Sequence, residues 1–125
     1  MKKLSAILIE LAEEVLAQPA DKTSDGGLHA ALLLAQVAWN RAIDQDEADS
    51  QGNYVGLLAQ FERDNPKARA DLKSHDCEEL IEELVQAKLD RYPLDDRFVF
   101  VCGTTPEGNV HVEWAHRKIK QKKRG

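Results

Sequence analysis

The sequence predicts an α+β protein with about four helices around a central apolar helix at residues 28–45, followed by a C-terminal antiparallel β-hairpin at residues 97–115. Two observations carry this prediction. Apolar residues recur at helical spacing over the first three quarters of the chain, and the period then changes from about 3.6 to 2 after residue 96. At 125 residues, the chain is long enough to build one core without disulfides.

The first helix is expected over residues 3–18, because apolar side chains follow each other at helical spacing and Pro19 comes directly after them. Glu10, Glu13 and Glu14 interrupt the apolar run. An amphipathic helix therefore explains this segment better than a signal peptide does.

The helix at residues 28–45 is apolar over most of its circumference, which is typical of a helix in the middle of a bundle. We expect its Trp39 and the later Trp114 to be core anchors. A narrow polar stripe remains, and it either lines a small polar pocket or forms a partly exposed helix edge. The stripe consists of His29, Gln36, Asn40 and Asp44.

The rest of the helical region is shorter and more polar. Residues 44–52 are predicted to form an acidic loop, and a short helix is expected near residues 54–63. Asp76, followed by Glu79 three residues later, has the spacing of a capping box and predicts a further helix. This helix should end at Tyr92, because a proline follows.

The hairpin is predicted from two alternating segments, residues 97–103 and 109–115, on either side of a turn at residues 106–108. This turn would pair Cys102 with Val112 and Phe100 with Trp114. One face would then carry Phe98, Phe100, Cys102, Val110, Val112 and Trp114, and the other Val99, Val101, His111 and Glu113.

A two-stranded hairpin is marginally stable alone, so its more apolar face should pack on the helices. The second face and both strand edges would stay open. A homodimer could cover them, with an interface made by Val99, Val101, His111 and Glu113. The short helix near residues 54–63, or the C-terminal tail, could instead lie across the hairpin.

The tail is strongly basic. We expect one domain at residues 1–116, in which eleven Lys and Arg face 22 acids, followed by a flexible tail at residues 117–125 with a charge of +6. The tail could bind RNA or DNA, although it has no aromatic residue for base stacking and the acidic body repels polyanions. Its cations are Arg117, Lys118, Lys120, Lys122, Lys123 and Arg124.

The chain offers little for catalysis. Cys77, in the first turn of a predicted helix, is the best candidate nucleophile, but it falls on the apolar stripe and is interpreted as a core residue. Cys102 and His111 would lie on opposite faces of the hairpin. The four histidines have no metal-ligand spacing, and we expect no cofactor.

The sequence therefore favours a non-catalytic interaction protein of the cytoplasm, homodimeric through its C-terminal hairpin and without a membrane role. The first alternative is a protein that binds RNA or DNA with its basic tail. The second is an enzyme with Cys77 as its nucleophile.

Overall fold

The structure of the chain is a computed structural model, which describes residues 3–19, 22, 25–50, 59, 63, 66, 70–74, 76–104 and 109–119. Within these residues the fold is α+β with a two-stranded antiparallel hairpin at the C-terminal end, as predicted. The hairpin turn at residues 106–108 and most of the helix expected at residues 54–63 lie outside the described residues. The elements in order are α1 (Leu4–Glu14), α2 (Asp25–Ile43), α3 (Gln45–Ser50), α6 (Cys77–Arg91), β1 (Arg97–Thr104) and β2 (Val110–His116).

Helix α1 ends four residues earlier than the apolar spacing predicts. Val15 leaves helical geometry, with φ −100° and ψ 0°. The chain then pairs with a distant segment: the N–H of Ala17 donates to the carbonyl of Asp71 at 2.8 Å, and the N–H of Lys73 donates to the carbonyl of Val15 at 2.8 Å. These tertiary hydrogen bonds replace the last turn of the expected helix.

The prediction of an acidic loop at residues 44–52 is wrong, because α3 (Gln45–Ser50) lies there. Asp44 explains the difference: its carboxylate accepts the N–H of Glu47 at 3.2 Å, as an N-capping side chain does. Asp46 and Glu47 also place negative charge in the first turn, where the helix dipole favours it.

Helix α6 begins and ends where the sequence predicts. The Asp76 carboxylate accepts the N–H of Glu79 at 3.2 Å, and the helix ends at Arg91. Its last turn contains Lys88, whose side chain is almost completely buried. The Lys88 ammonium donates to the carbonyls of Tyr92 and Asp95, both at 2.6 Å, and burial lowers its pKa to about 8.

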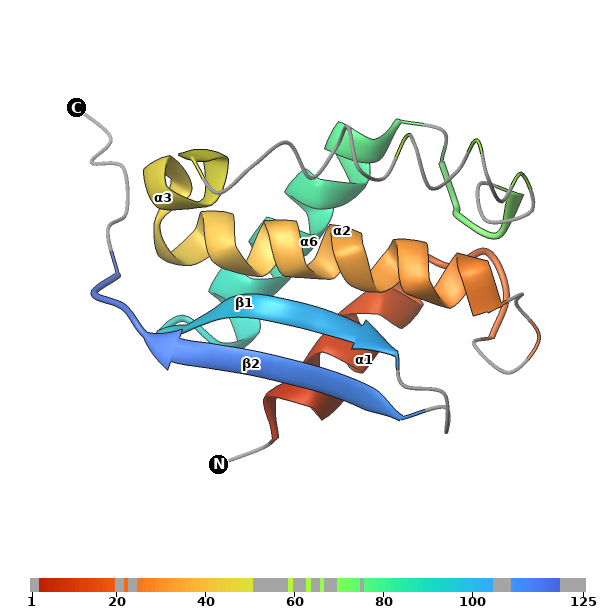
Figure 1. Cartoon of the computed structure of the whole chain (residues 1–125). Coiled ribbons are helices and arrows are strands. Elements are labelled where there is room, and N and C mark those ends of the chain that lie inside the picture. The colour runs from red at the N-terminus through yellow and green to blue at the C-terminus, as the bar shows by residue number, and fades with distance from the viewer. Residues whose placement is uncertain are drawn as a thin grey trace.

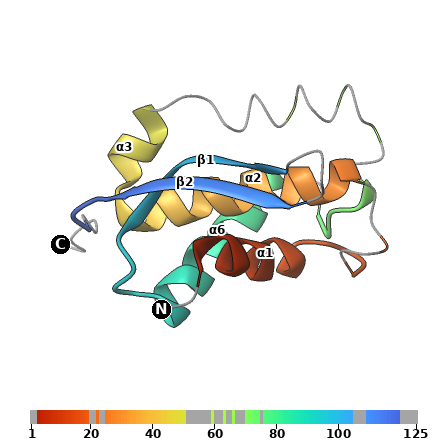
Figure 2. The ribbon, with the colours of Figure 1, turned by 60° about the horizontal axis from the view of Figure 1, so that its bottom comes forward.

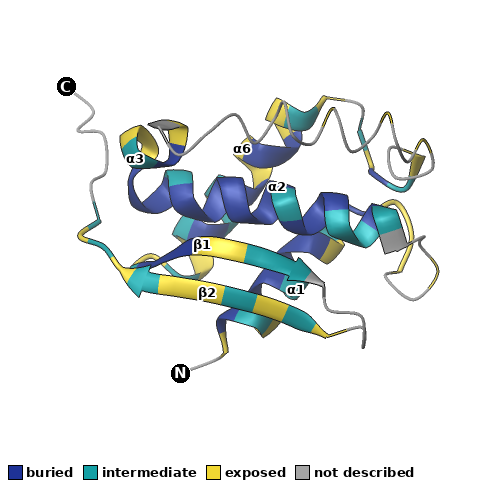
Figure 3. Cartoon of the chain, viewed as in Figure 1, coloured by how far each residue is buried: buried dark blue, intermediate teal, exposed yellow. Residues whose placement is uncertain are grey.

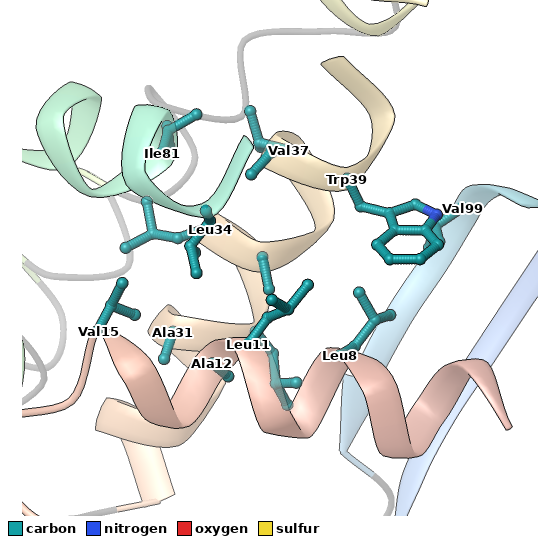
Figure 4. Close-up of a cluster of buried hydrophobic side chains, with 14 of the residues drawn as sticks. Leu8, Leu11, Ala12, Val15, Ala31, Leu34, Val37, Trp39, Ile81 and Val99 are labelled. Carbon is teal, nitrogen blue, oxygen red and sulfur yellow. The ribbon is translucent and has the colours of Figure 1, made fainter. Parts of the chain in front are cut away.

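The strands and helix α2 lie next to one another in one layer, in the order α2, β1, β2 (Figure 1). Helices α1 and α6 lie behind this layer, as the turned view also shows (Figure 2). The core fills the space between the two layers. It joins Leu8 and Leu11 of α1 to Leu34 of α2 and Ile81 of α6 (Figure 4). The N-terminal end of α1 emerges beyond the outer edge of β2 (Figure 1).

The register of the hairpin agrees with the prediction near the turn and differs from it near the base. Cys102 faces Val112, as predicted. The predicted pair of Phe100 with Trp114 is wrong, because Trp114 faces Val99 and Val101 faces Glu113. Phe100 is therefore the extra residue of a β-bulge.

The bulge changes which side chains share a face. Val99 joins Cys102 and Val112 on the inner face, since opposed residues of an antiparallel pair point to the same side, and it is fully buried. Phe98 and Phe100 touch each other, with ring centroids 5.6 Å apart, on the other side of the strand. A period of 2 in the sequence could not reveal this exchange, because one inserted residue reverses the alternation.

Candidate interaction site on the hairpin

Side chains of α2 occupy the edge of β1 that faces away from β2. The Asn40 side-chain amide binds both main-chain groups of Val99: its Nδ2 donates to the carbonyl and its Oδ1 accepts the N–H, each at 2.8 Å. Trp39 Nε1 donates to the carbonyl of Arg97 at 2.6 Å. These hydrogen bonds replace those that a third strand would make with this edge of β1.

The polar stripe of α2 therefore serves neither of the roles expected from the sequence. Asn40 is fully buried and Gln36 is 2% exposed, and both amides point at Val99. His29 is half-buried, and burial lowers its pKa. In the sequence, two amide side chains lie four residues apart on an otherwise apolar helix. Because buried amides require hydrogen-bond partners, this spacing could have revealed that Gln36 and Asn40 bind the main chain of a neighbouring element.

Among the described residues, nothing gives the outer edge of β2 a comparable cover. Both main-chain groups of Val99 point toward Asn40 and thus away from β2, so Val99 and Trp114 form a non-hydrogen-bonded pair. The N–H and the carbonyl of Trp114 therefore point away from β1. The same groups of Val112 and Val110 also point away from β1, because this direction repeats at every second residue of a strand. Within the described part of the chain, no third strand or side chain binds them.

A groove of about 420 Å³ lies beside this open edge, between β2 and the start of α1. Trp114 stands at its wall with 42% of its surface exposed, so the prediction of Trp114 as a core anchor is wrong, whereas Trp39 is fully buried as predicted. The residues that line the groove are Lys3, Leu4, Ser5, Arg97, Val110, His111, Val112 and Trp114.

Neighbouring side chains hold Trp114 in place. The Arg97 guanidinium lies over the indole ring, 5.5 Å from its centroid, and the His116 ring meets it edge-on at 5.1 Å. Arg97 is itself bound by Asp95, with Nε–Oδ1 at 2.9 Å and Nη2–Oδ2 at 2.5 Å. Although burial acts against it, the hydrogen bonds and the charge of Arg97 hold the pKa of the Asp95 carboxyl below its usual value.

The four residues expected at a dimer interface do not share one face. Val99 is fully buried, whereas Val101 is 42% exposed and His111 and Glu113 are exposed on the outer face. His111 Nε2 lies 3.5 Å from a Glu113 carboxylate oxygen. Phe100, 38% exposed, joins Val101 on this side of the hairpin.

The root of the basic tail contacts the rest of the molecule. The N–H of Arg117 donates to the carbonyl of Asp96 at 2.9 Å, and its guanidinium lies 3.3 Å from a Glu47 carboxylate oxygen and over the Phe100 ring. Lys118 is exposed, and Ile119 packs against the core. The other predicted cations, Lys120, Lys122, Lys123 and Arg124, lie outside the described residues.

The two thiols are both half-buried. Cys77 is the first residue of α6 and packs against the core, while its neighbour His75 lies outside the described residues. Burial raises the pKa of the Cys102 thiol to about 11, which disfavours the nucleophilic thiolate. In the part of the chain that the structure describes, no three His, Cys, Asp or Glu side chains form a group able to hold a metal ion.

None of the helices among the described residues is both long and apolar enough to span a membrane. No protein-family model matches the chain, and neither a curated protein nor a solved structure shows significant similarity to it.

Proposed function

We propose that this chain is a non-catalytic protein-binding module and that its binding surface is the outer edge of β2 with the adjoining groove. The difference between the two hairpin edges carries the proposal: Asn40 and Trp39 bind the edge of β1, whereas the main-chain groups of Val110, Val112 and Trp114 on β2 face outward. An open strand edge with an apolar pocket beside it is the surface on which an added strand docks, with main-chain bonds for affinity and pockets for alternate side chains.

The composition of the groove favours a protein partner over a nucleic acid. Trp114, Val110, Val112 and Leu4 supply its apolar surface, and aromatic side chains are enriched at protein interfaces. The charge of Arg97 is balanced by Asp95, and that of Arg117 by Glu47. Two cations at the base of the hairpin are thus already paired with acids of the same chain.

The proposal keeps two expectations from the sequence. Helix α2 would be the central apolar helix, in this case as the support on which β1 rests, since it packs against α1, α3, α6 and β1. The expected cytoplasmic homodimer is one form of the proposed interaction. Its interface would move from the outer face of the hairpin to the edge of β2.

Site-directed photo-crosslinking in cells that produce the full chain tests the proposal. A photoreactive residue replacing the exposed His111 on β2 should form covalent adducts with protein, either a second copy or another chain. The matched control replaces Gln86, which is exposed on α6 and far from the hairpin edge in sequence. Protein adducts from position 111 and none from position 86 are expected.

Two results would argue against a protein-binding edge. The first is an equal yield of protein adducts from both positions, which would indicate random collisions. The second is adduct formation with RNA or DNA that disappears when residues 117–125 are removed, which would favour the basic tail as the functional element.

A further inference from the structure

We propose that the partner at this edge is a second copy of the chain, and that the two β2 strands pair antiparallel about a twofold axis at Val112. This inference rests on the proposed function, because it assumes that the edge of β2 is the binding surface. It adds the identity of the partner and the register, neither of which follows from an open edge alone.

The direction of the main-chain groups permits this register. A twofold axis that passes between two antiparallel copies of a strand sets one residue opposite itself. The main-chain groups of Val112 point outward, because Val112 lies two residues from Trp114, which forms a non-hydrogen-bonded pair with Val99. Val112 would therefore exchange both hydrogen bonds with its own copy, and Val110 would do the same with Trp114 of the other copy.

The side chains are complementary in the same register. On the inner face, Val110 would stand opposite the partner's Trp114, and Val112 opposite its own copy, which makes a continuous apolar row. On the outer face, His111 would stand opposite the partner's Glu113. The twofold axis repeats the Val110–Trp114 and His111–Glu113 pairs, whereas the Val112 pair lies on the axis and occurs once.

Neighbouring registers lose this match. An axis at Glu113 would set two carboxylates directly opposite each other, and an axis at His111 would set two imidazoles opposite each other. Two carboxylates opposed across a strand pair repel each other, and two opposed imidazoles lose the pairing of His111 with Glu113. The charge order of β2 therefore selects Val112 among the axes at the middle of the strand.

The groove has a place in this assembly. The N-terminal end of α1 emerges past the edge of β2 in the layer behind the sheet (Figure 1). A partner strand added to the sheet would lie over this end of α1, and its inward side chains would enter the groove between Leu4 and Trp114. Burial of the half-exposed Trp114 would supply much of the driving force.

Sedimentation equilibrium of the full chain from about 1 µM to about 1 mM tests whether the second copy binds. A reversible monomer–dimer equilibrium is expected. The Val112→Pro variant removes an N–H that points outward, so it should keep the hairpin, judged by circular dichroism, and abolish the dimer. A native chain that stays monomeric throughout would overturn the inference.

A pair of charge variants tests the register itself. H111E sets two Glu–Glu pairs across the homodimer, and E113K removes the carboxylate from both His–Glu pairs, so each variant should dimerise about tenfold more weakly than the native chain. A mixture of the two forms one Glu–Lys pair and keeps one native His–Glu pair. We expect the mixture to form a heterodimer about as tight as the native dimer, which changes within one chain cannot explain.

Unchanged dimerisation of both variants, or a mixture no tighter than its components, would overturn the register about Val112. The crosslinking experiment separates this failure from a failure of the proposed function. Adducts from position 111 that contain only other proteins would leave the binding edge in place and remove the second copy as its partner.

Discussion

The two edges of the hairpin differ in how their main-chain groups are satisfied. At β1, the Asn40 amide binds the N–H and the carbonyl of Val99, and the indole of Trp39 binds the carbonyl of Arg97. At β2, no described residue does the same for Val110, Val112 or Trp114. The burial pattern follows this difference: β1 is buried at its base, while every residue of β2 is half-buried or exposed (Figure 3).

This comparison shows that a helix can close a strand edge with its side chains. An open edge is a template for pairing with another chain, and proteins usually protect it with charges, prolines or a covering element. Here α2 covers one edge. The other edge carries His111 and Glu113 on one face and half-exposed apolar groups on the other.

The largest expected effect comes from removal of the Asn40 amide. Asn40→Leu keeps the size of the side chain, leaves the buried N–H of Val99 without a partner, and leaves its carbonyl with only the 3.5 Å bond from Gln36. We expect the free energy of unfolding to fall by about 3 kcal/mol in urea denaturation. Gln86→Leu on the exposed face of α6 is the control and should change it by less than about 0.5 kcal/mol. Similar losses in both variants would contradict the role of Asn40.

The next effect concerns Lys88, which binds the two carbonyls of the turn before β1. Its pKa in the folded protein, about 8, lies below the unfolded value, so between about pH 8 and pH 10.5 the unfolded chain binds more protons. The free energy of unfolding should therefore rise with pH across this window, by about 2 kcal/mol relative to Lys88→Met. Parallel pH profiles for the two proteins would contradict a buried charge at Lys88.

A smaller effect is expected on the open side of the hairpin. Trp114→Ala should lower the free energy of unfolding by about 1 kcal/mol in dilute protein, because the ring is 42% exposed and contacts few core groups. Urea denaturation at low concentration measures this loss without a contribution from association. A loss of unfolding free energy as large as that of Asn40→Leu would show that Trp114 supports the fold of the single chain. Such a result would contradict the proposed difference between the two edges.

The smallest effect is expected at the root of the tail. Arg117→Ala removes the ion pair with Glu47 and the contact with Phe100, both on the surface. Exposed pairs of this kind contribute little, so the free energy of unfolding should change by less than about 0.5 kcal/mol. Thermal unfolding of the native and variant chains would detect a larger change, which would mean that the tail root helps to hold the outer face of the hairpin.

Local signals in the sequence predicted the hairpin strands, the α6 cap at Asp76 and the buried Trp39. They missed α3, because acidic residues in a first turn resemble a solvated loop until the capping bond of Asp44 is seen. They also missed the bulge at Phe100, which turns Val99 inward and so separates it from Val101, His111 and Glu113, the other residues expected at a dimer interface.

The sequence by itself determined the positions of α6 and the two strands and the cap of α6 at Asp76, because those signals depend on contacts within a few residues. Only the tertiary structure decided that Asn40 binds Val99, 59 residues away, and that no described residue covers the outer edge of β2. Hydrogen bonds between distant residues depend on how elements pack, and one bulged residue changes which groups face outward. For this reason the polar stripe of α2 was visible in the sequence, but its hydrogen bonds to Val99 were not.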